Sequence, residues 1–164
     1  MKASLRGGQD KDQPMAWGSR GRDGSVAMQQ PAFFGRTYDE AMTLMVEARN
    51  YMAYVEQRER RKAEAMAGLR MSCEAMRVTS RLTQVMAWLM MQRAVHAGEI
   101  EADDALSEPN RLSGLEVCLD QTFGRDEALP TGLRSLLERS LSLYQRIARL
   151  ENQMLERMHY INLH

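Results

Sequence analysis

Cysteine and long apolar runs are scarce in this sequence of 164 residues. Its two cysteines lie 45 positions apart, so they fit neither a disulfide framework nor a four-ligand zinc pattern, and we expect a reducing cytoplasm. No apolar run reaches the roughly 18 residues of a membrane-spanning helix, so no membrane insertion is expected. The 22 basic and 22 acidic residues cancel, which removes the overall positive charge expected of a general nucleic-acid-binding protein.

β-Branched apolar residues are also few, and this indicates the fold class. Val and Ile together number 10, whereas Ala and Leu number 18 each and Met numbers 14. Unbranched side chains keep more rotamer freedom in helices, while β-branched ones favour strands. The length fits one domain with one hydrophobic core. We therefore predict an all-α protein.

Glycine is concentrated near the start of the chain. Six of the 11 glycines precede residue 36, together with two of the 4 prolines, and the apolar residues there follow no period. Such a segment cannot bury enough surface to offset the entropy lost on ordering. We predict a disordered tail over residues 1–32, without the apolar core of a secretory signal, and a single helical-bundle domain over residues 33–164.

Three long helices are predicted from apolar periodicity. The first runs from about residue 37, where Thr37 and Glu40 have the spacing of a capping box, to the mid-60s. The second runs from about 69 to 97 and ends at Gly98, and the third runs from about 131 to 159. A short turn at Gly68 makes the first two antiparallel neighbours. Thr131 is the expected N-cap of the third. We predict an antiparallel bundle of three helices.

The second helix contains a stretch, residues 85–91, that is apolar on all sides. Such a stretch is covered on several sides, either as the central helix of one chain or in the interface of a homodimer. Methionine is frequent on the first two helices. Met side chains fill cores and also serve surfaces that accept several partners, and the sequence does not separate the two roles.

A long acidic connection separates the second and third helices. Residues 99–130 contain nine acidic and two basic residues, a net charge of −7. Connections of this length are usually functional or disordered. Among them, Asp103, Asp104 and Glu108 are candidate protein-interaction residues.

A basic stripe on the second helix gives the other candidate interaction residues. Arg70, Arg77 and Arg81 recur on one side of the helix, which suits an acidic partner or phosphate, or else is simply an exposed face. This stripe is the basis of an alternative function as a nucleic-acid-binding transcriptional regulator.

Signatures of catalysis are weak. Glu156 and His159 have the Glu-x-x-His spacing of di-iron bundles, but no second such pair accompanies them. No phosphate-binding glycine loop is present, and neither Cys73 nor Cys118 lies in a nucleophile signature. We expect a protein that is not an enzyme and has no cofactor, with a carboxylate-bound metal enzyme as the remaining catalytic alternative.

Three stretches resemble a known family: Phe33–Ala41 with Met45–Arg49, Arg77–Leu89, and Leu136–Leu141. Together they resemble the regulator-of-CtrA-degradation (RcdA-like) proteins of alphaproteobacteria, over residues 33–155. The resemblance implies a non-enzymatic, helical-bundle adaptor, often dimeric. Such adaptors act with the protease ClpXP and the response regulator CpdR, help present cell-cycle regulators such as CtrA for degradation, and can concentrate at a cell pole. A purely structural dimeric scaffold is the further alternative.

Overall fold

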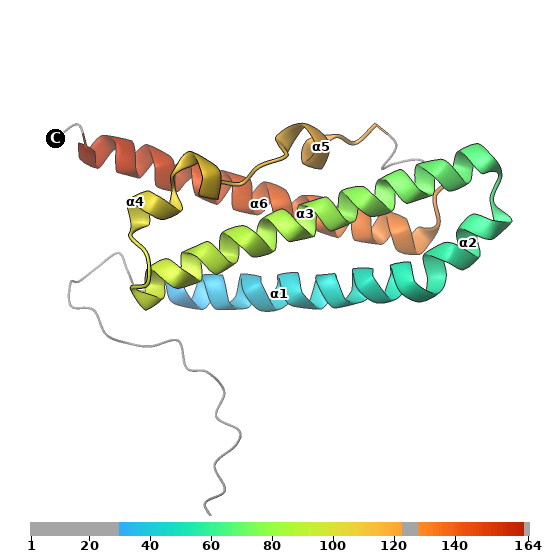
Figure 1. Cartoon of the computed structure of the whole chain (residues 1–164), viewed down its shortest axis with the longest axis horizontal. Coiled ribbons are helices and arrows are strands. Elements are labelled where there is room, and N and C mark those ends of the chain that lie inside the picture. Colours follow the sequence, from blue (N-terminus) through green and yellow to red (C-terminus); the bar gives the residue numbers. More distant parts are fainter. Residues whose placement is uncertain (1–29, 123–127, 163–164) are drawn as a thin grey trace, which may run out of the picture.

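The computed structural model describes residues 30–122 and 128–162, which form an all-helical bundle (Figure 1). The predicted tail over residues 1–32 lies outside the described residues, except for residues 30–32, which are helical. The long helices are α1 (Gln30–Tyr51), α3 (Ala65–Ala97) and α6 (Thr131–Asn162). The path of α1 continues through the π-helix η1 (Met52–Glu56) into α2 (Gln57–Lys62). The connection between α3 and α6 contains α4 (Ala102–Ala105), the 3-10 helix η2 (Glu108–Asn110) and α5 (Leu115–Leu119).

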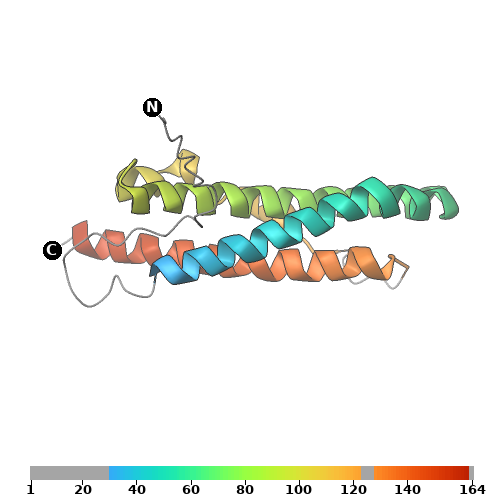
Figure 2. The ribbon, with the colours of Figure 1, turned by 90° about the horizontal axis from the view of Figure 1, so that it is seen from below.

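The long helices do not alternate in direction. Figures 1 and 2 show α1 running antiparallel to α3 and α6, which run parallel to each other. Ion pairs of Arg146 with Glu40 and of Arg139 with Glu47 connect α1 and α6 in antiparallel register. The predicted antiparallel arrangement is therefore right for α1 with each partner and wrong for α3 with α6. The connection is long because it has to return along the bundle before α6 begins.

The first helix begins earlier than its capping signal predicts. Thr37 lies inside α1 and is buried, so the predicted capping box is wrong. The ring of Phe34 packs 5.9 Å from that of Trp88 and 5.2 Å from that of His96, measured between centroids. Burial of this aromatic ring favours extension of the helix beyond Thr37, and tertiary packing outweighs the local signal.

Two glycines were predicted to mark the ends of α3, and the prediction is wrong for Gly68 and confirmed for Gly98. The turn before α3 lies at Ala63 and Glu64, which are extended, and Gly68 belongs to the first turns of α3 itself. A Cβ on Gly68 would lie 3.2 Å from Cγ of Arg60, so this glycine allows α2 to pack closely on α3. Gly98 ends α3 in the left-handed conformation, as predicted, and the Glu99 amide bonds the carbonyl of Ala94.

The core lies where the three long helices meet. Within residues 85–91, Val85, Met86, Trp88 and Leu89 are buried by the other elements, while Ala87 and Met90 are exposed. Most of this apolar stretch is thus covered within one chain. The methionines divide in the same way, with some in the core and others at the surface.

Candidate interaction surfaces

A buried arginine fastens the connection to the bundle. The side chain of Arg81 is only 2% exposed. Its Nε donates to the carbonyl of Cys118 at 2.7 Å, its Nη1 to that of Leu137 at 3.0 Å, and its Nη2 to that of Asp120 at 3.1 Å. The planar guanidinium can reach three carbonyls on two different elements, α6 and the connection, which a lysine ammonium could not match in geometry. Arg81 therefore acts as a structural link.

The neighbouring arginine is neutralised by acids. Arg77 forms an ion pair with Glu74 and a second one, at 2.8 Å, with Oδ2 of Asp120. The Arg77 side chain is 12% exposed, so little of its charge reaches solvent. The connection thus covers one side of α3 through polar contacts.

The predicted basic stripe is therefore not a continuous surface. Arg70 is exposed near the start of α3, Arg77 is largely covered, and Arg81 is buried. The prediction of an exposed stripe is wrong for Arg81, since the returning connection covers it. Helical spacing places side chains on one side of a helix but does not show which segment packs there.

The ion pair between the Asp120 carboxylate and Arg77 is sensitive to acid, because the pKa of Asp120 is lowered. Hydrogen bonds from the hydroxyl and amide of Thr122, and then the charge of Arg77, hold the pKa of this carboxyl below its ordinary value. A carboxyl with a lowered folded-state pKa stabilises the fold above its unfolded-state pKa, and this contribution is lost as pH falls through the folded-state value.

We expect the stability difference between the wild type and Asp120→Asn to be largest at neutral pH and to shrink in acid. Urea unfolding followed by circular dichroism from pH 7 to pH 3 measures this. A matched variant, Asp103→Asn, should change the stability at neutral pH far less, because this side chain is exposed. A constant gap for Asp120→Asn would contradict the assignment.

The predicted acidic interaction residues lie together near the other end of α3. Asp103 and Asp104 are exposed on α4, and Glu108 is exposed on η2. The carbonyl of Asp104 accepts hydrogen bonds from Ser107 and Asn110, which holds this turn while leaving the carboxylates at the surface. Figure 1 shows α4 far from the beginning of α3, so these acids and Arg70 form separate surfaces.

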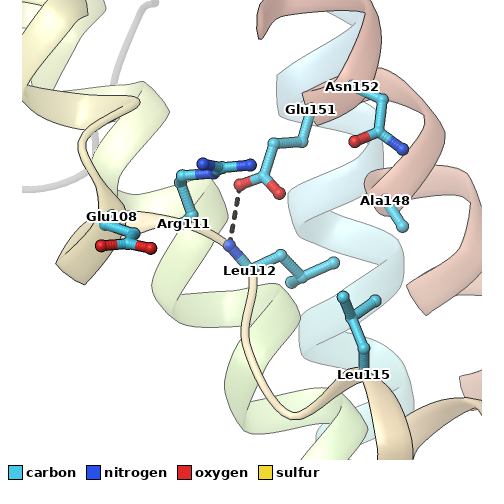
Figure 3. A pocket seen from close by; sticks show the side chains of 7 residues that line it. All are labelled: Glu108, Arg111, Leu112, Leu115, Ala148, Glu151 and Asn152. Carbon is cyan, nitrogen blue, oxygen red and sulfur yellow. Dashed lines mark hydrogen bonds between the residues drawn. The ribbon is translucent and has the colours of Figure 1, made fainter.

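A pocket that the sequence did not suggest lies between the connection and α6 (Figure 3). Its volume is about 250 Å³, and Glu108, Arg111, Leu115 and Glu151 are among its lining residues. Glu151 is almost fully buried and accepts a hydrogen bond from the Leu112 amide at 2.7 Å. The sequence contained one indication of this buried acid, since Glu151 lies at a position that continues the apolar spacing of the third helix.

One face of α3 carries no charged residue and is largely exposed. Uncharged residues recur there with alternating spacings of three and four, the pattern of a helix that packs against another helix. Leu69 is 58% exposed and Met76 is 70% exposed. The members are Met66, Leu69, Cys73, Met76, Ser80, Thr83, Ala87, Met90 and Ala94, all of them exposed or half-buried. We call this set the α3 seam.

The remaining catalytic candidates are isolated. Glu156 and His159 are exposed in the last turns of α6, and within residues 30–122 and 128–162 no three His, Cys, Asp or Glu residues are grouped to hold a metal ion. Cys73 is exposed, and Cys118 is buried, which raises the pKa of its thiol. None of the described helices is both long and apolar enough to cross a membrane.

Comparison with known proteins agrees with the resemblance seen in the sequence. The profile of a family described as "Protein of unknown function (DUF1465)" matches residues 26–162. The chain belongs to this family. The crystal structure of RcdA from Caulobacter crescentus CB15 is similar, with a TM-score of 0.60 and 33% sequence identity over 74% of this chain and 91% of that chain. The predicted RcdA-like relationship of this DUF1465 protein is thus confirmed, while comparison with curated proteins gave no match.

Proposed function

We propose that this protein is a non-enzymatic adaptor of regulated proteolysis. It presents regulatory client proteins, such as CtrA, to the protease ClpXP, and it acts with the response regulator CpdR in the cytoplasm or at a cell pole. The similarity to RcdA over most of both chains carries this proposal. The all-helical fold supports it, because a bundle displays several separate side-chain surfaces on one rigid body.

Two surfaces suit such a role. The exposed acids Asp103, Asp104 and Glu108 offer a negative surface for a basic partner segment. The α3 seam offers an apolar helix face, and we propose that it forms a homodimer by packing against the same face of a second copy. The acidic surface lies on the connection, so it stays available in this dimer.

The alternatives predict different behaviour. A purely structural dimeric scaffold needs the α3 seam but no protease partner. A nucleic-acid-binding regulator needs a continuous basic surface, and the burial of Arg81 together with the pairing of Arg77 takes two of its three candidate residues away.

Co-purification from cells in which the chromosomal copy carries a tag tests the proposal. We expect ClpX, CpdR or a regulatory client to be enriched above the untagged control. The variant Asp103→Asn/Asp104→Asn/Glu108→Gln should reduce that recovery. A matched triple of exposed acids away from this turn, Glu64→Gln/Glu116→Gln/Glu138→Gln, should leave it unchanged. Recovery of no protease component and no client would leave the adaptor proposal without support.

A further inference from the structure

The bundle tip formed by η1 and α2 contains a basic pocket. It has a volume of about 370 Å³ and is lined by Tyr54, Gln57, Arg58, Arg61 and Lys62. The π-helix η1 contains Tyr54 and interrupts the regular helix just before the other four residues, and such π-helical turns occur frequently at functional sites. The sequence alone suggests only a mixed-charge helix end here, since acids and bases alternate.

The structure sorts these alternating charges. Glu59 accepts a hydrogen bond from the hydroxyl of Tyr51 on α1. Glu56 pairs with Nε of Arg60 at 3.5 Å and accepts a hydrogen bond from Ser72 on α3 at 3.4 Å. Both acids therefore bind groups of this chain, and these contacts leave them less able to neutralise the bases that line the pocket.

The bases that line the pocket have no such partners. Arg58, Arg61 and Lys62 form no ion pair with any residue in the part of the chain that the structure describes. Beside them, the ring of Tyr54 is 71% exposed, so it offers an apolar face with a polar tip to a partner. Three cations and an exposed ring thus converge on one hollow.

We propose that this pocket binds an acidic peptide segment of a partner protein. Carboxylates of the segment pair with Arg58, Arg61 and Lys62, and an apolar side chain of the same segment packs on the ring of Tyr54. Guanidinium groups suit this role, because they bind carboxylates through two parallel hydrogen bonds.

The confinement of the charge favours a peptide over other anionic partners. Nucleic acid needs cations spread along its backbone, but beyond Arg70 the next arginines of α3, Arg77 and Arg81, are paired or buried. An anionic membrane surface is typically bound by clusters of four to eight basic residues. Only three bases line this pocket, because the fourth base of α2, Arg60, pairs with Glu56. The proposal is independent of the protease role, since the partner is defined only by its charge and its apolar side chain.

Fluorescence anisotropy with a fluorescein-labelled EDLEDL peptide, at about 50 mM salt, tests the proposal. We expect binding to the full-length protein, and about a tenfold loss of affinity in Arg58→Gln/Arg61→Gln/Lys62→Gln. The control Arg36→Gln/Arg149→Gln/Arg157→Gln removes the same charge from exposed positions away from this tip and should change the affinity less than about twofold.

Further arms separate the pocket from diffuse attraction and from other partners. Tyr54→Ala should weaken EDLEDL binding severalfold, and the neutral peptide QNLQNL should bind far more weakly than EDLEDL. Equal losses in the two triple variants, or no binding of EDLEDL, would overturn the proposal. Tighter binding of single-stranded DNA or phosphatidylglycerol vesicles than of EDLEDL, lost in the pocket triple, would also overturn it and assign the site to that class of partner.

Discussion

Replacing Arg81 with Met should lower the free energy of unfolding by about 3–5 kcal/mol. The substitution keeps an unbranched apolar stem but removes hydrogen bonds to three backbone carbonyls, on Cys118, Asp120 and Leu137. Hydrogen bonds from a charged donor contribute about 1.5–3 kcal/mol each, and they are not additive when they share one group. Buried carbonyls left without donors add a desolvation cost.

Urea unfolding followed by helical circular dichroism, at one fixed protein concentration, measures this loss. Arg81→Lys should recover only part of it, because an ammonium lacks the fork that serves carbonyls on two elements. Arg70→Met is the matched control on the same helix, and its exposed position should hold the change to within about 0.5 kcal/mol. Equal stability of the Arg81 and Arg70 variants would show that the link is not needed for the fold.

Placing charge on the α3 seam should separate the proposed homodimer into monomers. The double variant Leu69→Glu/Met76→Glu puts two carboxylates into an apolar helix face, where each would lose hydration in the dimer. We expect the dissociation constant to rise about a hundredfold or more, since a desolvated, unpaired charge costs several kcal/mol. Both positions are more than half exposed in one chain, so the fold itself should be retained.

Sedimentation velocity at tens of micromolar protein measures the change. The control Met42→Glu/Val46→Glu introduces the same charges at exposed apolar positions of α1 and should leave the dimer intact. A wild-type protein that sediments as a monomer at this concentration would contradict the homodimer. The seam would then have to be assigned to another partner.

The helices themselves could be predicted from the sequence because their signals are local. Apolar spacing along one chain indicates a helix wherever it packs, and Gly98 gives a stop that needs no tertiary contact, since its left-handed backbone suits glycine. The predicted capping box at Thr37 failed, because Phe34, three residues earlier, gains more by packing on α3 than the cap offers.

The direction of α6 and the burial of Arg81 could not be predicted in the same way. Both depend on where residues 99–130 return along the bundle, and that segment has too few periodic apolar residues to indicate its path. The sequence does not distinguish a buried arginine that donates to backbone carbonyls from a surface arginine. Every residue has a backbone carbonyl, so no particular residue type marks the partners. The basic pocket could not be predicted for a similar reason. Only the folded structure shows which of the alternating acids and bases form contacts within the chain.

The lifetime of regulatory proteins tests the adaptor function most directly. Pulse labelling with proteome-wide mass spectrometry should compare wild-type cells, cells lacking this protein, cells lacking ClpX, and cells lacking both. The adaptor function predicts a small set of regulators, with CtrA as the first candidate, whose half-lives lengthen severalfold without this protein and lengthen no further when ClpX is also absent. Unchanged half-lives of every ClpXP substrate in cells lacking this protein would contradict it.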